Sequence, residues 1–206
     1  MISVEQFLKW IRFAHEKIQQ HKNELTELDQ AIGDGDHGVN LARGFEAVVQ
    51  KLDAHEGKDL GALCQEIGMT LIAKVGGASG PLYGTAFVRM ATAWKGKQSV
   101  TYPEFVQGIE AGANGIQARG KAGLGDKTML DVWLPLADYL ARETETVSWK
   151  EVERFVYQQM KSTESMEAKK GRAAFLGARS IGHRDPGAVS SYYLFAALCQ
   201  TMEMKE

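Results

Sequence analysis

Helical periodicity runs through almost the whole chain and limits its fold more than any other feature. Between Phe7 and Ile18, apolar residues recur at steps of three and four positions among lysine, glutamate and glutamine. Alternating β-branched runs bounded by turns are missing, and the short run 99–102 fits a connection better than a strand. The sequence therefore predicts an all-α fold.

Glycine, proline and polar clusters divide the chain into helical segments. We expect eight helices, near 3–31, 38–53, 59–75, 80–95, 102–119, 128–143, 148–165 and 187–204. Ser3 with Gln6, and Ser148 with Glu151, have the spacing of a capping box. Short connections favour antiparallel neighbours, so we expect an eight-helix antiparallel up-and-down barrel or bundle.

Length and composition favour one soluble domain that spans residues 1–206. The net charge of −2 argues against a nucleic-acid binder, which usually carries a basic face. No N-terminal signal pattern and no run of about 18 apolar residues occurs, so we expect a cytoplasmic protein outside the membrane. Cys64 and Cys199 lie in apolar stretches, which favours two buried free thiols.

Glycine-containing loops precede every second helix of this arrangement. They are 33–38, 76–81, 123–128 and 180–187. In an up-and-down arrangement these helices all begin at the same end of the molecule. Helix N-termini present free backbone N–H groups and a partial positive charge, and glycine lets a ligand approach the backbone closely. The pattern predicts a polyanionic ligand at that end.

Three aspartates, Asp29, Asp34 and Asp36, lie within eight residues beside the first of these loops. Carboxylates so close repel one another unless water or a cation intervenes. Magnesium is usually held by a few carboxylates together with water and substrate phosphates. One ion needs one or two of these groups, so three suggest a pair of ions. Helix capping in a solvated loop is the structural alternative.

Other motifs fail on their spacing or context. The run 33–38 formally matches a dinucleotide fingerprint, but it follows a long helix instead of a strand. A calcium loop starting at Asp34 fails because its later ligand positions hold Gly38 and Phe45. Asp126 interrupts the ending of a P-loop, and no strand precedes it.

The segment 164–186 lacks clear periodicity, and a loop of this length in a compact domain is usually functional. It is rich in lysine and arginine, which suits an acidic ligand, and Arg172 is our preferred contact. For His37 and His183, a ligand contact and an ordinary loop position both remain open. For Ser79 and Thr128, helix capping is the alternative to binding phosphate.

Four ordered motifs resemble those of the nucleotide-binding L domain of dihydroxyacetone kinases. They are Asp29–Gly38, Gly76–Gly80, Gly125–Asp131 and Gly171–Ala188. The resemblance extends from residue 1 to 206, and it implies a single L-type domain. The family fold it implies is an eight-helix antiparallel barrel with the nucleotide at one end.

The resemblance also implies the site residues. Asp29, Asp34 and Asp36 would hold two Mg²⁺ ions that bridge the phosphates of ADP. The nucleotide would be lined by His37, Gly38, Val39, Asn40, Ala78, Ser79, Gly120, Thr128, Met129, Arg172, Asp185, Pro186 and Gly187. No catalytic residue beyond this site is implied, because the acceptor and its base would belong to a partner.

In one arrangement of the family the L unit is fused to other domains and uses ATP. In the other it is a separate subunit, and this chain resembles that kind. The resemblance then implies tightly held ADP, phosphorylated by a phosphohistidine of an M subunit and passing phosphate to dihydroxyacetone on a K subunit. The alternatives are an ATP-dependent L subunit for another small sugar or ketone, a regulatory module that binds a transcriptional regulator, and a metal-dependent phosphohydrolase. A homodimer is compatible with each.

Overall fold

The computed structural model describes residues 1–54, 57–143 and 147–204. Residues 55–56 and 144–146 belong to two of the expected connections and lie, with 205–206, outside the described part. The described helices are α1 (Val4–Gln20), α2 (Lys22–Ile32), α3 (His37–Leu52), α4 (Leu60–Lys74), α5 (Ser79–Ala93), α6 (Tyr102–Gly120), α7 (Leu130–Arg142), α8 (Trp149–Ser162) and α9 (Pro186–Glu203). The shorter elements are β1 (Ile2–Ser3), β2 (Ser99–Val100) and the 3₁₀ segments η1 (Thr163–Ser165) and η2 (Arg172–Ser180). The predicted all-α fold is confirmed.

The first predicted helix, 3–31, is two helices that meet at His21. The backbone there leaves the helical region, with φ −102° and ψ 14°. The His21 ring stacks on Tyr193 with 4.2 Å between centroids, and its Nδ1 lies 3.0 Å from a carboxylate oxygen of Glu24. The stacking joins residues far apart in the chain, and a local apolar period does not reveal such a contact.

Two further local predictions differ from the structure. The run predicted as a connection contains β2, which pairs antiparallel with β1. A strand of two residues is too short to show an alternating pattern. Ser3 forms the predicted capping box of α1, but the expected capping box at Ser148 is wrong. The backbone carbonyl of Ser148, and not its hydroxyl, accepts the Glu151 N–H at 2.9 Å.

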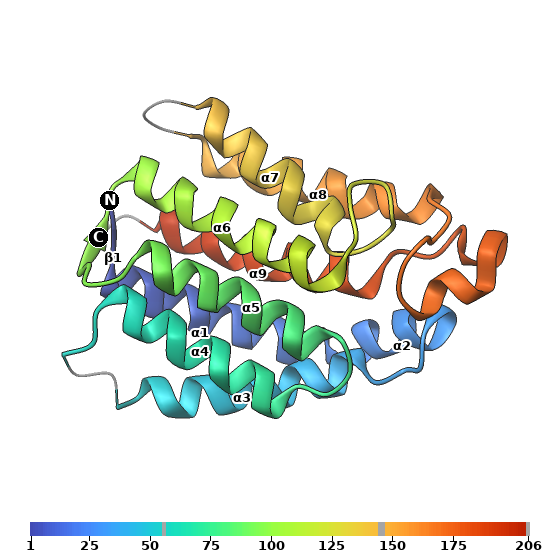
Figure 1. Cartoon of the computed structure of the whole chain (residues 1–206), viewed down its shortest axis with the longest axis horizontal. Coiled ribbons are helices and arrows are strands. Elements are labelled where there is room, and N and C mark those ends of the chain that lie inside the picture. The colour runs from blue at the N-terminus through green and yellow to red at the C-terminus, as the bar shows by residue number, and fades with distance from the viewer. Residues whose placement is uncertain (55–56, 144–146, 205–206) are drawn as a thin grey trace.

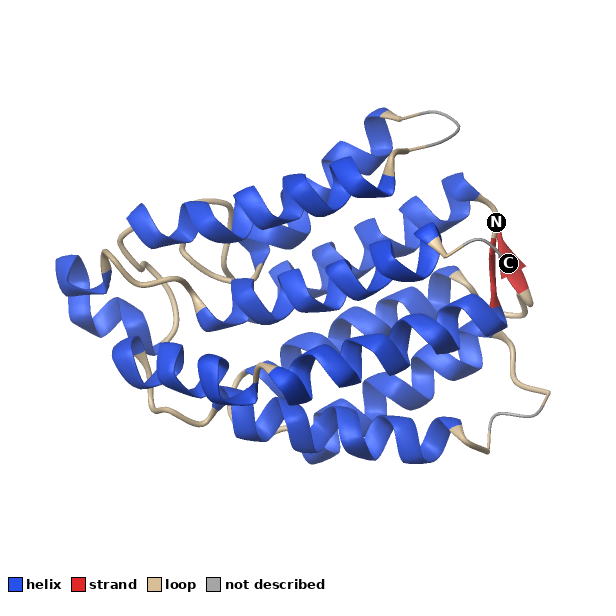
Figure 2. Cartoon of the chain, turned by 180° about the vertical axis from the view of Figure 1, so that it is seen from behind, coloured by secondary structure: helices blue, strands red, loops and turns tan. Residues whose placement is uncertain are grey.

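The helices pack side by side in a closed ring. α3 packs on α1, each later helix packs on the one before it, and α9 packs on α1 (Figures 1 and 2). α2 lies beyond the end of α1 and contacts α3 and α9. The short connections therefore join neighbours, as expected for an up-and-down chain.

The core inside this ring is apolar and continuous. Most apolar positions of α1 from Phe7 to Ile18 are buried in it, and the indoles of Trp10, Trp94 and Trp133 are fully enclosed. Burying a large apolar side chain contributes about 1.5–3 kcal/mol, so this core dominates the stability. Cys64 and Cys199 are buried free thiols, as predicted. No described helix combines the length and the apolar character needed to cross a bilayer.

The connections 33–36, 75–78, 121–129 and 163–185 all lie at one end of the ring, on the right in Figure 1. β1, β2 and the last turn of α9 lie at the opposite end. The prediction that the glycine loops meet at one rim is confirmed.

Candidate phosphate and metal site

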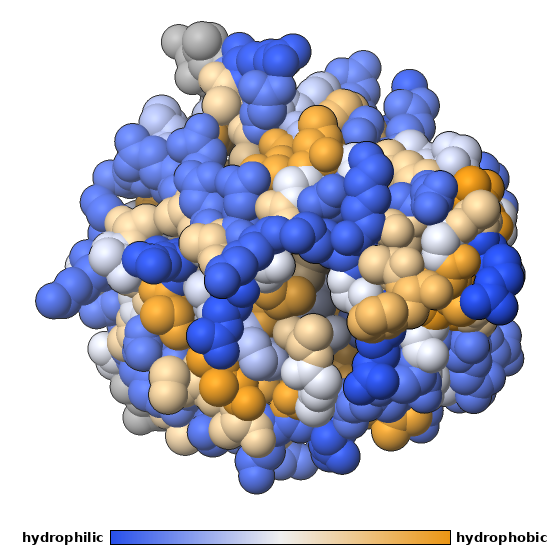
Figure 3. Space-filling view, turned by 45° about the vertical axis from the view of Figure 1, so that its right-hand side comes forward, coloured by the Kyte–Doolittle hydropathy of each residue, from blue (hydrophilic) through white to orange (hydrophobic). Residues whose placement is uncertain are grey.

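A cavity of about 430 Å³ opens where the four glycine loops meet. Figure 3 is turned toward this end and shows a hollow bordered by both hydrophilic and hydrophobic residues. The cavity is lined by Asp29, Ile32, Gly33, Asp34, Asp36, His37, Gly76, Gly77, Ala78, Ser79, Leu82, Lys127, Thr128, Met129, Lys170, Gly171, Arg172, Ala173, Asp185, Pro186 and Gly187. Residues from distant segments of the chain therefore line the same cavity.

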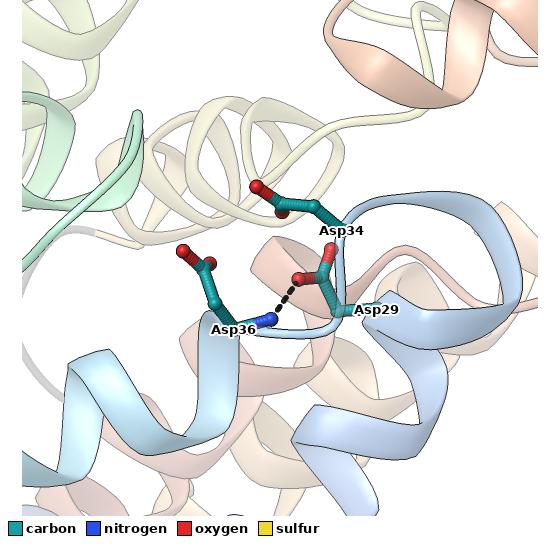
Figure 4. A group of neighbouring side chains, drawn as sticks. All are labelled: Asp29, Asp34 and Asp36. Carbon is teal, nitrogen blue, oxygen red and sulfur yellow. Dashed lines mark hydrogen bonds between the residues drawn. The ribbon is translucent and has the colours of Figure 1, made fainter.

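The three aspartates come together where α2 ends and α3 begins. Each offers an oxygen, and these atoms lie within 4.8 Å of one another. Figure 4 shows the carboxylates grouped around the short turn between the two helices. Two glycines make the turn feasible: a Cβ at Gly33 would lie 2.1 Å from Oδ1 of Asp29, and Gly35 has φ +76°. A side chain is disfavoured at both positions.

Asp29 also stabilises the start of α3. Its Oδ2 accepts the backbone N–H groups of Asp36 at 2.9 Å and His37 at 3.1 Å. These N–H groups have no partner inside the helix, and the helix dipole favours a negative charge beside them. The capping interpretation is therefore correct for Asp29, but its other oxygen remains available within the cluster.

The cluster suits a hard divalent cation. All donors are carboxylate oxygens, which magnesium prefers. Asp34 already pairs with a positive group, since Nη2 of Arg172 lies 3.0 Å from its Oδ2. This ion pair places Arg172, the ligand contact preferred from the sequence, beside the aspartates. The residues present thus fit the expected metal.

His37 and Ser79 form the wall beside the aspartates. The His37 ring is buried, and its Nδ1 lies 2.9 Å from Oγ of Ser79, the first residue of α5. Burial lowers the pKa of His37 to about 4, although Asp29 and Asp34 act in the opposite direction. At neutral pH the ring is uncharged and acts through hydrogen bonds.

The loop before α7 holds Thr128 and Met129 against the cavity. Asp131 organises it, because its carboxylate accepts the N–H groups of Gly125 at 2.5 Å and Thr128 at 2.8 Å. The Thr128 hydroxyl oxygen accepts the N–H of Leu130, the first residue of α7, at 3.2 Å, but Met129 is the N-cap residue of that helix. The hydroxyl proton remains available to a ligand.

Lys127 is a site residue that the sequence interpretation missed. Its ammonium is buried and donates to three backbone carbonyls, those of Met166 at 3.0 Å, Ser180 at 2.7 Å and His183 at 2.6 Å. Its φ of +60° is unusual for a residue with a side chain. Lys127 thereby joins the loop before α7 to the long segment before α9.

The turn Asp185–Gly187 begins α9 as predicted. Oδ2 of Asp185 accepts the N–H of Ala188 at 2.7 Å, and Pro186 occupies the first turn. Burial raises the pKa of Asp185 to about 7, and the nearby Asp131 carboxylate adds to the rise. The N–H of Ala188 and the Lys127 ammonium act in the opposite direction.

Most of the predicted site residues line the cavity, but four do not. Gly120 lines an adjoining apolar cavity of about 260 Å³, which shares Ala78, Thr128 and Met129 with the first. Gly38 packs against α2, where an added Cβ would lie 2.1 Å from the Lys22 carbonyl oxygen. Val39 is exposed and Asn40 accepts a hydrogen bond from Arg43 at 2.8 Å. Contact of these four with a ligand stays a prediction.

The chain shows extensive similarity to known proteins. Residues 31–200 match the model of the DAK2 domain. The chain is 44% identical over 202 residues to the PEP-dependent dihydroxyacetone kinase, ADP-binding subunit DhaL, of Escherichia coli (strain K12), with 96% of each chain covered. It is 41% identical over 202 residues to the PTS-dependent dihydroxyacetone kinase, ADP-binding subunit DhaL, of Lactococcus lactis subsp. lactis (strain IL1403), covering 98% of this chain and all of that one.

A solved structure shares the fold. The dihydroxyacetone kinase from C. freundii in complex with AMP-PNP and Mg²⁺ superposes with a TM-score of 0.75 at 22% identity. The match covers 94% of this chain and 33% of that longer chain. The residues matched by the domain model make up most of this sequence, so the chain belongs to the DAK2 domain family.

Proposed function

We propose that this chain is the ADP-binding, phosphoryl-transferring subunit of a phosphoenolpyruvate-dependent dihydroxyacetone kinase in the cytoplasm. The observation that carries the proposal is the cluster of Asp29, Asp34 and Asp36 on a cavity closed by helix N-termini. The relatives named as ADP-binding subunits support ADP as the nucleotide, because the similarity covers nearly the whole of both chains. On this proposal, residues 1–206 act as one nucleotide-binding domain.

Asp29, Asp34 and Asp36 would hold two Mg²⁺ ions, which neutralise charge on the phosphates during transfer. The chain supplies the rest of the electrostatic environment. Ser79 and Thr128 offer hydroxyl groups, and Arg172 offers a guanidinium that now rests on Asp34. The start of α9 adds the backbone N–H of Gly187, because Pro186 has none and that of Ala188 is bonded to Asp185. Such fixed donors stabilise a transferred phosphoryl group without covalent chemistry by the protein.

The adjoining cavity suits the adenine base. It is lined mainly by apolar groups, including Pro81, Leu82 and Ile116, and it shares Met129 with the first cavity as a lining residue. A flat aromatic ring is favoured in such a space, while the phosphates require the polar one. This division would place Gly120 beside the base.

Both the donor of the phosphate and its acceptor would belong to partners. An M subunit would phosphorylate the bound ADP from its phosphohistidine, and a K subunit would hold dihydroxyacetone. The absence of an acceptor base is consistent with the residues that the structure describes, because burial lowers the pKa of His37 to about 4 and makes the ring a weak base at neutral pH.

Reconstitution tests the proposal. We expect the purified chain to carry ADP and magnesium that a chelator releases, and to support phosphate transfer to dihydroxyacetone only with the K and M subunits and the phosphoenolpyruvate system. Asp34→Asn removes a proposed ligand and should abolish ADP retention while the circular dichroism of the helices stays unchanged. Asp53→Asn is the matched control, because Asp53 pairs with Arg12 on the surface, away from the cavity.

Three outcomes would contradict parts of this proposal. Transfer from ATP with the K subunit alone would replace the M subunit as donor. Steady release of free phosphate by the chain alone would indicate a phosphohydrolase. A chain that neither retains ADP nor gains thermal stability from added Mg-ADP would overturn the nucleotide site itself.

A further inference from the structure

A chain of buried hydrogen bonds runs from the core to the cavity. It begins at Trp133, whose indole nitrogen lies 3.0 Å from Oγ of Ser191. Ser191 lies 2.9 Å from the hydroxyl of Tyr83, and Tyr83 lies 2.7 Å from Oγ of Ser190. Oγ of Ser190 then lies 2.9 Å from Nε2 of His37. All five side chains are buried, so each polar atom needs its neighbour as a hydrogen-bond partner in place of water.

The far end of this chain reaches the phosphate side of the cavity. Nδ1 of His37 lies 2.9 Å from Oγ of Ser79, and Ser79 lines the cavity. Ser190 itself is fully buried and is not among the lining residues. It can therefore influence a ligand only through its hydrogen-bonding neighbours, among them His37 and Gly187.

The hydrogen bonds can run in two arrangements. An indole N–H only donates, so Ser191 accepts from Trp133, and in the first arrangement it gives its own proton to Tyr83. Tyr83 then donates to Ser190, and Ser190 donates to Nε2 of His37. A neutral imidazole carries one proton, which in this arrangement lies on Nδ1 and is donated to Ser79.

A second arrangement reverses the last two bonds. Ser190 would donate to the carbonyl oxygen of Gly187 at 3.1 Å, and His37 would carry its proton on Nε2. Ser79 would then donate its proton to Nδ1 of His37 and could not donate it to a ligand. The carboxylates of Asp29 and Asp34 lie on the cavity side, and negative groups there favour a proton on the nearer nitrogen.

We propose that Ser190 is a positioning residue for the phosphate groups of the nucleotide. Its hydroxyl donates to Nε2 of His37, which fixes the ring as the Nδ1–H tautomer and leaves the Ser79 proton free to point into the cavity. This role rests on the proposed function, because a phosphate oxygen is the acceptor for that proton. In the reverse arrangement a lone pair of Ser79 would face the anion instead.

The tautomer is measured on the whole chain without nucleotide, by long-range ¹H–¹⁵N correlation of ¹⁵N-labelled histidine at neutral pH in the presence of a chelator. We expect the Nδ1–H form of His37 in the wild type and loss of that single form in Ser190→Ala. Thr201→Val is the matched control: Thr201 is another buried hydroxyl of α9, bonded only to the Ala197 carbonyl at 2.8 Å. It should leave the His37 spectrum unchanged.

Calorimetric titration with Mg-ADP measures the consequence for binding. We expect Ser190→Ala and Ser79→Ala each to weaken ADP about tenfold, the size of one lost hydrogen bond to a charged group. The double variant should bind within about twofold of either single variant, because both remove the same bond. If Ser190→Ala does not fold, Ser190→Cys fills the site with a slightly larger side chain and a weaker donor, and it should bind with intermediate affinity.

An Nε2–H tautomer in the wild type would overturn the proposal. So would additive losses in the double variant, or a Ser190 variant that folds and keeps both the wild-type tautomer and the wild-type affinity. A wild-type chain that binds no ADP would refute the proposed function instead, and the tautomer comparison would still decide whether Ser190 sets the state of His37.

Discussion

Replacing Lys127 with methionine should loosen the long segment before α9 without unfolding the helices around it. The Lys127 ammonium donates hydrogen bonds to the carbonyls of Met166, Ser180 and His183, which therefore converge on it. Methionine keeps most of the aliphatic stem but donates no hydrogen bond. The three carbonyls then lose a shared partner, and the segment that carries Arg172 loses its attachment to the loop before α7.

The size of the effect follows from the three bonds. Each hydrogen bond from a charged donor contributes about 1.5–3 kcal/mol, so the three set a ceiling of about 5–9 kcal/mol. Taking the ammonium out of water costs part of that, as the lowered pKa of Lys127 indicates. We expect a net loss of about 3–5 kcal/mol, the range for breaking a buried charged contact. Opening of the segment should therefore become at least about 100-fold more frequent.

Hydrogen exchange at two backbone amides measures this opening. The N–H of Lys169 donates to the Asp126 carbonyl at 3.1 Å, and that of Gly182 donates to the Glu164 carbonyl at 2.7 Å. Lys121→Met is the control, because Lys121 also has a positive φ of 51° but is exposed. Exchange that changes less than tenfold in Lys127→Met, or equally in both variants, would refute the reasoning.

Two further predictions concern packing and pH. Gly38→Ala should lower the melting temperature, because its Cβ would lie 2.1 Å from the Lys22 carbonyl oxygen and overpacking costs about 1–3 kcal/mol; Gly123→Ala, with its nearest atom at 3.9 Å, should not. Burial raises the pKa of Asp185 from its ordinary value of 3.8 to about 7, so between these pH values the folded chain holds a proton that the unfolded chain releases. Asp185 therefore makes the free energy of unfolding fall as pH rises through that window. Asp185→Asn, which still caps α9, should remove this fall when unfolding by urea is measured with a chelator present. An unchanged pH profile in the variant would contradict the raised pKa.

The sequence predicts the helices well because each helix packs one face on the core, and this burial requires apolar residues at every third or fourth position. The ends of α6 and α9 fall within one residue of the expected bounds, helped by prolines in their first turns. The break at His21 escaped prediction because the contact made there, the stacking on Tyr193, joins residues far apart in the chain. The β1–β2 pair escaped because two residues give no period.

Residues that face a ligand were easier to predict than residues that hold the site together. Asp29, Asp34 and Arg172 stand out by charge in glycine-rich segments, and all three line the cavity. Lys127 looked like part of a failed P-loop, since nothing local shows that its ammonium is buried. The hydroxyls at 190–191 did offer a signal, because they form a polar pair inside the otherwise apolar start of α9.

The three aspartates differ in how the protein offsets their charge, and this difference indicates where a cation is needed most. Asp29 rests on the N–H groups that begin α3, and Asp34 pairs with Arg172. The Asp36 carboxylate makes no capping bond to α3 and lies within 4.8 Å of the other two. The fold therefore compensates two of the charges with its own groups and leaves the repulsion of the third to solvent or an ion. A cation at this cluster would relieve that repulsion and release Arg172 toward a phosphate, so metal and nucleotide binding should reinforce each other.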